Sequence, residues 1–315
     1  MTPTTPPSPE TPRPKVSVCV VTYNQEKYIA QCLQSLVDQE TDFPFEVIVS
    51  DDCSTDGTSD IVMDFAHRYQ NIIKPIIHQK NIGAYKNFIF VHQQAVGEYI
   101  AHVDGDDYAL PDKLKKQSKF LDDHGECNIV WHRMFVKNEA ADIVCEDLIQ
   151  YELLPKSGFD RGDILRFITI GMNSSKMYRS SVRDFVLPNF PVVDYFANVE
   201  HIRDGKAFFV DSEPLGVYRA GIGIASSGLG TRKILADCFM YFGSRYPEHR
   251  RCVGSAVFLL MVAAIKNRRW DVVSIYLKPT VHLASFGSII DVYKFWGISK
   301  MLRMPNAIRR TEGSK

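Results

Sequence analysis

The chain has 315 residues, a formal net charge of zero, 45% hydrophobic residues and 23% charged residues. This is ordinary composition for a globular protein of about two domains, and it gives no argument for nucleic-acid binding over the whole chain. The longest uncharged run, residues 252–265, is shorter than the roughly 20 residues that span a bilayer, so we predict no transmembrane helix. The seven cysteines are scattered without a CxxC pair, which favours free thiols in a reducing, cytoplasmic compartment.

Residues 1–14 are rich in Thr and Pro and contain no apolar segment, so we expect a disordered tail rather than a signal peptide. After this tail, short apolar runs alternate with segments of helical periodicity. Strands are expected at residues 16–21, 45–50, 72–78 and 99–103. A helix is expected after each of the first three strands, and Asn24 is expected to cap the first helix. This alternation predicts a parallel, doubly wound sheet, in which ligands bind at the carboxyl ends of the strands.

Polar residues mark the ends of three of these strands. Thr22, Asp51 and Asp104 follow the first, second and fourth strands, and Asp104 begins a run that contains Asp106 and Asp107. Carboxylates this close raise one another's pKa values unless a cation neutralises them. A hard divalent ion such as Mg²⁺ or Mn²⁺ is the natural partner, held by one or two carboxylates and substrate phosphates. Taken alone, however, the same run is equally typical of an Asp/Gly turn.

Two common classes of nucleotide-binding protein lack support in the sequence. No GxGxxG follows the first strand and no GxxxxGK[ST] occurs in the chain, which argues against a Rossmann dehydrogenase and a P-loop NTPase. From about Glu126 the regular alternation lapses into mixed short strands and loops. We therefore expect a first domain over 15–125, a second region over 126–230 and a helical region over 231–315. The four-glycine segment 221–230 is either a mobile lid or an interdomain linker.

The C-terminal region carries an uneven charge. From Lys266 onward, ten Lys and Arg residues stand against three acidic residues, which leaves a charge of +7. Aromatic residues such as Trp270 and Trp296 are interleaved with these basic residues. Basic residues with interfacial aromatics suit an anionic membrane surface. A solvated helical face or a subunit contact is the alternative.

Five segments in order carry a resemblance to a known family. They are VSVCVVTYNQEKYIAQCLQSL, FEVIVSDDCSTDGT, NIGAYKNF, AVGEYIAHVDGDD and PDKL. Over roughly residues 15–120 the sequence resembles the family-2 glycosyltransferases, which transfer a sugar from a nucleotide-sugar donor. The resemblance implies an α/β protein with a GT-A-like doubly wound, mostly parallel sheet, a smaller acceptor region and a helical C-terminal tail. Residues 15–125 would bind the nucleotide-sugar, and 126–230 would bind the acceptor and supply a catalytic base.

The resemblance also implies roles for residues that contact the donor. Thr22 and Tyr23 would line the nucleotide pocket, and Asp51 would accept a hydrogen bond from the base. Asp52 is expected to be a turn residue. Lys86 stands where the family commonly has a basic residue near the base or the diphosphate, and a solvated helix lysine is the alternative.

The acidic run matches the family's DxD motif. Asp104 would approach the ribose or a metal-bound water, and Asp106 would coordinate the Mn²⁺ or Mg²⁺ that bridges the diphosphate. Asp107 would assist the metal or support the loop. Relatives often have a histidine two residues after a Tyr-Arg pair, but here Gly221 takes that place. Either the metal lacks this ligand, or Arg219 or a serine of the segment that follows contacts the diphosphate.

An inverting transfer needs a general base for the acceptor hydroxyl, opposite the leaving group. The resemblance makes Asp194 the candidate, and a helix N-cap is the alternative role for this residue. The histidines of the first domain, such as His78, His92 and His102, are expected to be structural.

The sequence therefore predicts an inverting, metal-dependent glycosyltransferase that uses a UDP- or dTDP-sugar. Its acceptor would be a glycan or a polyprenyl-diphosphate-linked molecule in surface polysaccharide biosynthesis. The protein would be cytoplasmic, docking peripherally on the inner face of the membrane. A nucleotidyltransferase is one alternative, although TYNQEKY does not resemble a glycine- and basic-rich triphosphate loop. A non-catalytic binding module of the same fold is the other alternative, and the intact acidic motif argues against it.

Overall fold

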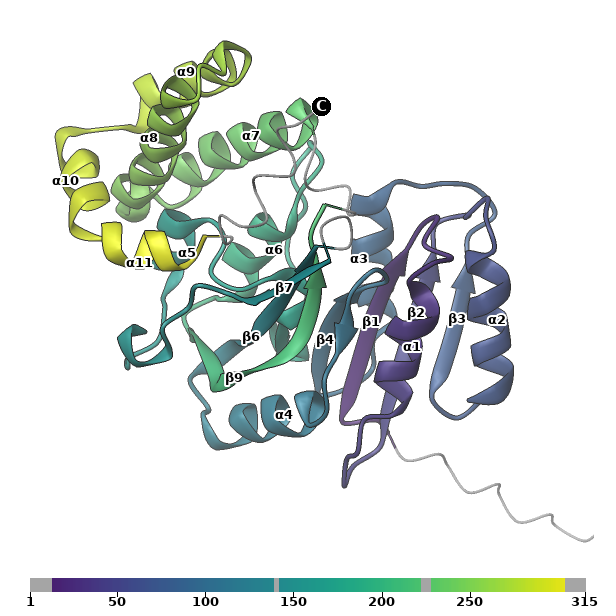
Figure 1. The fold of residues 1–315 in the computed structure, drawn as a ribbon. Coiled ribbons are helices and arrows are strands. Elements are labelled where there is room, and N and C mark those ends of the chain that lie inside the picture. The colour runs from purple at the N-terminus through teal and green to yellow at the C-terminus, as the bar shows by residue number, and fades with distance from the viewer. Residues whose placement is uncertain (1–12, 139–141, 222–227, 304–315) are drawn as a thin grey trace, which may run out of the picture.

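The computed structural model describes residues 13–138, 142–221 and 228–303. Its strands form one sheet in the order β3-β2-β1-β4-β8-β6-β9-β5, with β7 paired to β6 (Figure 1). The strands are β1 (Val16–Thr22), β2 (Phe45–Asp51), β3 (Ile73–Ile77), β4 (Tyr99–Asp104), β5 (Tyr108–Ala109), β6 (Cys127–Asn138), β7 (Ile143–Glu146), β8 (Met177–Arg179) and β9 (Lys206–Arg219).

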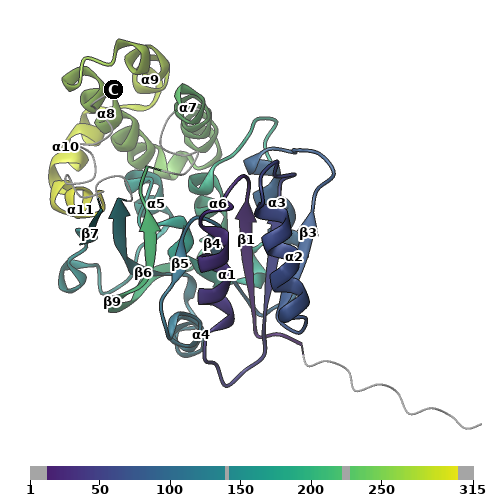
Figure 2. The same ribbon diagram turned by 45° about the vertical axis from the view of Figure 1, so that its right-hand side comes forward.

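Helices surround this sheet and form a separate group at the C-terminal end of the chain. The α-helices are α1 (Ile29–Val37), α2 (Thr58–Arg68), α3 (Ala84–Gln94), α4 (Lys113–Asp123), α5 (Arg161–Phe167), α6 (Asp194–His201), α7 (Leu229–Arg245), α8 (Arg250–Lys266), α9 (Trp270–Leu283), α10 (Phe286–Lys294) and α11 (Trp296–Met301). The group α7–α11 lies at the opposite side of the molecule from β3 (Figures 1 and 2).

The first four strands are parallel to one another. β1, β2 and β4 are buried on both faces, whereas the edge strand β3 is partly exposed. Successive side chains of a strand point to opposite faces. Val18 and Val20 accordingly share a core cluster with Leu33 of α1 and residues of α2, whereas Cys19 belongs to a cluster with Val91 of α3. Covering helices on both faces are the physical reason why these strands read as continuous apolar runs. All four predicted strands are confirmed, and their ends differ from the predicted ends by one residue.

The predicted role of Asn24 as a helix cap is wrong. Helix α1 begins five residues later, and its N-cap position is Tyr28, without a side-chain cap bond. Asn24 instead has a positive φ of 52°, a conformation that asparagine tolerates better than most residues. Its side-chain oxygen accepts a hydrogen bond from Thr55 N at 2.8 Å. Asn24 therefore ties the loop after β1 to the loop after β2.

The second half of the sheet is built differently from the prediction of mixed short strands. β6 has 12 residues and β9 has 14, and these two long strands pair in parallel. Register shifts occur between Cys127 and Ile129 and again between Trp131 and Phe135. Such bulges break the strict two-residue period, so the pattern in the sequence is hidden. β8 joins β4 and β6 by antiparallel pairing, so the two predicted regions share one sheet. The domain boundary near Glu126 stays a prediction.

The helical character of the C-terminal region is confirmed. Helices α6, α7, α8 and α9 share one apolar cluster, in which the Phe196 and Phe242 rings stack with centroids 4.8 Å apart. Close approach of α8 to the end of α9 and the start of α10 depends on Gly254. A Cβ atom at this position would lie 2.5 Å from the backbone oxygen of Leu283 and 2.5 Å from Ser288 Oγ.

Gly254→Ala is expected to destabilise the protein by about 1–3 kcal/mol, because the added methyl group meets backbone rather than a flexible side chain. Chemical denaturation measures this change. Gly297→Ala is the matched control, since a Cβ there meets nothing within 4 Å and alanine favours a helix. Equal stability of the two variants would contradict the packing argument.

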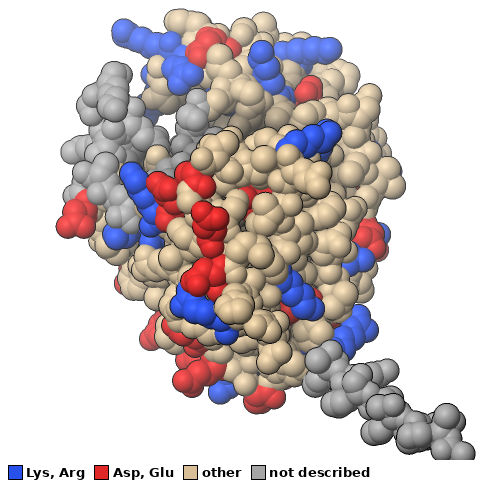
Figure 3. All heavy atoms as spheres, turned by 90° about the vertical axis from the view of Figure 1, so that its right-hand side faces the viewer, with Lys and Arg blue, Asp and Glu red and all other residues tan. Residues whose placement is uncertain are grey.

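The structure also bears on the predicted cysteines, membrane spans and terminal segments. All seven cysteines are free, as predicted. Within the described ranges, no helix is long and apolar enough to cross a membrane. Most of the predicted tail, residues 1–12, and most of the predicted lid, residues 222–227, lie outside the described residues. On the face of the molecule that carries α2 and β3, acidic and basic side chains are intermixed (Figure 3), in keeping with the zero net charge.

Candidate active site

Three polar strand ends lie side by side at one edge of the sheet. β1 is the central strand of the three, with Thr22 paired to Asp51 of β2 and Val21 paired to Asp104 of β4. Backbone hydrogen bonds extend this pairing into the loops, because Gly105 N donates to Val21 O at 2.9 Å. The predicted convergence of Thr22, Asp51 and Asp104 is therefore confirmed.

The three carboxylates of the loop after β4, which we call the acidic loop (residues 104–107), differ in exposure. The side chain of Asp104 is 34% exposed, whereas Asp106 and Asp107 are 4% and 1% exposed. Both oxygens of Asp107 have internal partners, since one accepts from the backbone N–H of Arg219 at 2.8 Å and the other from the hydroxyl of Ser174. Asp107 therefore stabilises the loop through internal hydrogen bonds.

Burial and mutual repulsion set the charges of the acidic loop. Burial, followed by the nearby charge of Asp104, raises the pKa of Asp106 to about 6. Burial and the charges of Asp106 and Asp104 raise the pKa of Asp107 well above its usual value. Burial also pushes the pKa of Asp104 upward, but His102 and Ser174 outweigh it and leave this pKa below its usual value. Full ionisation of the loop is costly, and a cation would relieve that cost.

The acidic loop offers few protein ligands for a divalent cation. Among the residues that the structure describes, no three His, Cys, Asp or Glu side chains are gathered as a ready-made metal cluster. Mg²⁺ commonly binds to one or two carboxylates together with substrate phosphates and water, rather than to an all-protein cage. Asp104, which reaches solvent, and Asp106, whose pKa is raised, fit that mode of binding.

Arg219, at the end of β9, is buried against the acidic loop. Its guanidinium donates to the backbone oxygen of Asp106 and to the side chain of Gln31. The same group lies over the rings of Tyr28 and Tyr108, at 5.0 and 4.9 Å from their centroids. These contacts fasten the loop to β9 and α1. The predicted contact of Arg219 with a diphosphate stays a prediction.

The residues expected to contact the nucleotide lie on the β1 and β2 side of the loop. Thr22 is buried, Tyr23 is 36% exposed, and Lys86 is exposed on α3. Asp51 is fully buried, and its carboxylate accepts from Ser54 N at 3.1 Å and from Ser59 Oγ at 2.6 Å. Asp51 thus closes the turn that follows β2, and its predicted bond to a base stays a prediction.

Asp52 connects distant loops, which goes beyond the local turn expected from the sequence. Its two carboxylate oxygens accept from Ile82 N at 2.7 Å and from Gly83 N at 2.9 Å. Gly83 has a φ of 90° and occupies the N-cap position of α3, a backbone conformation that favours glycine. Asp52 therefore fixes the start of the helix that carries Lys86.

Asp194 is the first residue of α6, whose N-cap position is Val193. It is half-buried, and its carboxylate accepts from Tyr195 N at 2.8 Å. Burial raises the pKa of Asp194, although the Tyr195 N–H and the charge of Lys176 oppose this shift. The charge of Asp104 also acts on Asp194, so the two carboxylates lie within electrostatic range of each other.

Three residues that support the site were missed in the sequence. Ser174 accepts from Asp104 N at 3.0 Å through its hydroxyl and from the buried Lys113 Nζ at 2.6 Å through its carbonyl. Burial lowers the pKa of Lys113 to about 8. Lys176 is also fully buried, and its Nζ donates to Asn198 Oδ1 at 3.0 Å. Lys113 lies in the PDKL segment, whose match to the family could have indicated a role for this lysine. Ser174 and Lys176 lie in a stretch without a motif.

The sheet order and the helices that cover the sheet define an α/β protein with a GT-A-like fold. The chain belongs to glycosyl transferase family 2. The family model with that description matches residues 17–182, which is more than half of the chain and includes the whole acidic loop.

Curated relatives match parts of the chain. An uncharacterized protein of Mycobacterium tuberculosis is 35% identical over 209 residues, which cover 65% of this chain and 58% of that protein. The putative glycosyltransferase EpsE of Bacillus subtilis is 39% identical over 128 residues, or 40% of this chain and 45% of EpsE. The chain thus spans less than two thirds of the length of these relatives.

Solved structures share the fold. A TarS fragment of Staphylococcus aureus in complex with UDP-GlcNAc has a TM-score of 0.57 at 23% identity, covering 76% of this chain and 70% of the fragment. The mannosyltransferase PcManGT of Pyrobaculum calidifontis, in complex with GDP-Man and Mn²⁺, has a TM-score of 0.51 at 18% identity and covers 92% and 85% of the two chains. These likenesses confirm the predicted fold class.

Proposed function

We propose that this protein is an inverting, metal-dependent glycosyltransferase. It moves a sugar from a UDP- or dTDP-sugar to a glycan or a polyprenyl-diphosphate-linked acceptor, in the biosynthesis of a surface polysaccharide. The observation that carries the proposal is the acidic loop, in which partly exposed Asp104 and buried Asp106 lie at the end of β4, next to the end of β1 that carries Thr22. Membership of the family, and the UDP-GlcNAc bound to TarS, support the class of donor.

Two carboxylates of the acidic loop hold the cation in this proposal. Asp106 and Asp104 bind Mn²⁺ or Mg²⁺, and Asp107 keeps the loop in place through Ser174 and Arg219. When bound, the cation offsets the negative charge that develops on the nucleoside diphosphate leaving group. The Mn²⁺ in the mannosyltransferase complex supports this choice of ion.

The nucleotide lies along the ends of β1 and β2. Thr22 and Tyr23 form the wall of its pocket, Asp51 receives a hydrogen bond from the base, and Lys86 approaches the base or the diphosphate from α3. Arg219 contributes to the diphosphate side of the site by holding the acidic loop in place. The tight internal bonding of Asp51 and Asp52 holds this wall rigid before the donor arrives, which reduces the ordering cost of binding.

Asp194 acts as the general base. It accepts the proton of the acceptor hydroxyl while that oxygen bonds to the anomeric carbon, and the bond from this carbon to the diphosphate breaks on the opposite side. The raised pKa of Asp194 makes it a stronger base than an exposed aspartate. Burial lowers the pKa of Lys176 to about 8, but the nearby charges of Asp194 and Asp104 oppose this shift and favour the charged ammonium close to Asp194.

A thermal-shift screen of nucleotide-sugars, with and without Mn²⁺, tests the proposal. A ligand that binds the native state raises the melting temperature, so a UDP- or dTDP-sugar with Mn²⁺ should raise it and neither component alone should match that shift. A response to UTP and a sugar phosphate, without a response to any nucleotide-sugar, would favour a nucleotidyltransferase instead.

The proposed docking on an anionic membrane is supported by α10, which buries polar residues and exposes apolar ones. This helix buries Ser288 and Asp291, and Asp291 is held by a two-pronged ion pair from Arg251 of α8. Its exposed residues form an apolar stripe at helical spacing, namely Phe286 (79% exposed), Ile289, Ile290 and Tyr293 (89% exposed). A contiguous exposed apolar face marks an interaction surface. Exposed lysines at 278, 294 and 300 belong to α9, α10 and α11, and their positive charge suits anionic lipid headgroups.

The double substitution Phe286→Ser and Ile290→Ser is expected to weaken binding to vesicles of phosphatidylglycerol and phosphatidylcholine by about tenfold or more, because it removes the apolar part of the contact. Sedimentation with vesicles measures this. Val186→Ser is the control, since Val186 is 74% exposed but lies outside the C-terminal helices. Failure of the unaltered protein to sediment with these vesicles would refute membrane docking and leave the transferase proposal standing.

A further inference from the structure

A continuous chain of buried hydrogen bonds leads away from the acidic loop. Asp104 Oδ1 lies 3.1 Å from His102 Nε2, His102 Nδ1 lies 2.9 Å from His92 Nε2, and His92 Nδ1 lies 2.8 Å from the hydroxyl of Tyr178. The chain crosses three elements, because His102 belongs to β4, His92 to α3 and Tyr178 to β8. Both histidines and the tyrosine are at most 3% exposed.

The hydrogen-bond chain has one direction. In their neutral form, the two imidazoles each carry one N–H and one acceptor nitrogen. The ionised Asp104 can only accept, which places the proton of His102 on Nε2 and leaves its Nδ1 as an acceptor. His92 must then donate from Nε2 and accept at Nδ1, where the Tyr178 hydroxyl is the donor. Every donor in the chain meets one acceptor.

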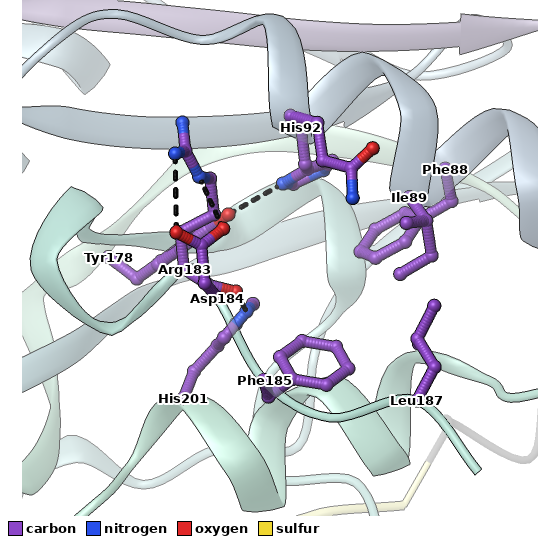
Figure 4. A pocket seen from close by; sticks show the side chains of 10 residues that line it. Phe88, Ile89, His92, Tyr178, Arg183, Asp184, Phe185, Leu187 and His201 are labelled. Atoms are coloured by element: carbon purple, nitrogen blue, oxygen red, sulfur yellow. Dashed lines mark hydrogen bonds and ion pairs between the residues drawn. The ribbon is translucent and has the colours of Figure 1, made fainter.

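The far end of this chain does not belong to the donor site. His92 and Tyr178 line a cavity of about 140 Å³ together with Arg183, Phe185 and other residues, and the two point toward each other at its edge (Figure 4). Within the hydrogen-bond chain, His92 and Tyr178 are linked to the acidic loop through His102.

We propose that His102, His92 and Tyr178 are positioning residues that orient the Asp104 carboxylate for the metal-bound donor. The proposal rests on the proposed function of the acidic loop. The His102 bond to Oδ1, together with the longer contact that the Ser174 hydroxyl donates to Oδ2 at 3.4 Å, fixes the plane of the Asp104 carboxylate. Hydrogen-bonding partners of this kind, one shell behind a ligand, typically change metal affinity by 10- to 100-fold.

Three variants of the full-length chain separate positioning from packing. His102→Leu removes the donor to Asp104, whereas His102→Gln keeps an N–H at the end of a side chain of similar reach. Tyr178→Phe removes only the hydroxyl that fixes the His92 tautomer. Phe88→Leu is the packing control, because the Phe88 ring contacts both imidazoles, at 4.2 and 5.1 Å between centroids, without joining the hydrogen-bond chain.

Calorimetry with UDP and Mn²⁺ gives the first test. His102→Leu should weaken Mn²⁺-dependent UDP binding about 10- to 100-fold, Tyr178→Phe should weaken it less, and His102→Gln should restore most of it. Phe88→Leu should leave the affinity near that of the unaltered protein. Equal losses in His102→Gln and His102→Leu, or no loss in His102→Leu, would overturn the positioning role. If the unaltered protein binds neither UDP nor dTDP in the presence of Mn²⁺, the proposed function itself fails.

Nitrogen NMR of the unliganded protein tests the hydrogen-bond chain separately from function. Both His92 and His102 should be neutral with the proton on Nε2, and Tyr178→Phe should change the signals of His92. A proton on Nδ1 of either residue, or a charged imidazolium, would show that the chain does not run from Tyr178 to Asp104, whatever the binding data show.

Discussion

Asp106→Ala should abolish the Mn²⁺-dependent part of UDP binding. Asp106 is assigned to the cation because burial and the charge of Asp104 raise its pKa to about 6, whereas both oxygens of Asp107 already accept internal hydrogen bonds. Losing a direct ligand should cost at least as much as losing a hydrogen-bonding partner behind one, which is on the order of 100-fold in metal affinity. Calorimetry with UDP, in Mn²⁺ and in EDTA, measures the difference that the metal makes.

Two further variants serve as controls for this experiment. Asp60→Ala removes an exposed carboxylate at the start of α2 and should leave the metal dependence unchanged. Asp107→Asn should mainly lower the melting temperature, because Asp107 accepts from Ser174 and from Arg219 N inside the loop. If Asp106→Ala retains the full effect of Mn²⁺ on UDP binding, the assignment of the metal to Asp106 is wrong.

The sequence predicted the strand ends well because parallel strands that are covered on both faces leave a clear signal. Continuous apolar runs locate β1, β2 and β4, and a polar residue that interrupts such a run marks the carboxyl edge of the sheet. Thr22, Asp51 and Asp104 are adjacent by strand pairing alone. The same reasoning could not tell whether a carboxylate there faces a ligand or its own loop, and Asp51 bonds to Ser54 and Ser59.

The residues that support the acidic loop were missed because they lie far from it in the sequence. Ser174 is 70 residues from Asp104, and the two meet only because β8 pairs antiparallel with β4. Nothing in the sequence around Lys176 indicates that a lysine is fully buried there. His102 was expected to be structural. Its bond to Asp104 is local to β4, but its bond to His92 depends on α3 lying against β4.

The C-terminal region shows a different limit of sequence reasoning. Counting basic and aromatic residues indicated a surface for anionic lipid, but it could not say which helix face is exposed. In α10 an ion pair of Arg251 with Asp291 turns the polar side inward, and the apolar stripe is left outside. Periodicity alone would have assigned that stripe to the core.

Asp194→Asn should lose sugar transfer by about 10²- to 10⁴-fold, the usual contribution of a general base, while it still binds UDP and Mn²⁺. The asparagine has the size of the aspartate and can accept from Tyr195 N as Asp194 does, so the start of α6 is kept. Release of UDP, measured with the donor sugar that the thermal-shift screen identifies, reports the rate. Calorimetry reports donor binding, and the two together separate catalysis from binding.

Glu200→Gln is the matched control, because it removes a second carboxylate from the same helix. Glu200 accepts from the Tyr246 hydroxyl at 3.2 Å and is assigned no part in the reaction, so its loss should change stability more than turnover. If Asp194→Asn turns over at a rate near that of the unaltered protein, Asp194 only stabilises the N-terminus of α6, where a negative charge is favourable in any case. If both UDP binding and turnover fall together, the substitution has disturbed the site that Asp194 shares with Lys176 and Asp104, and the assignment as base loses its support.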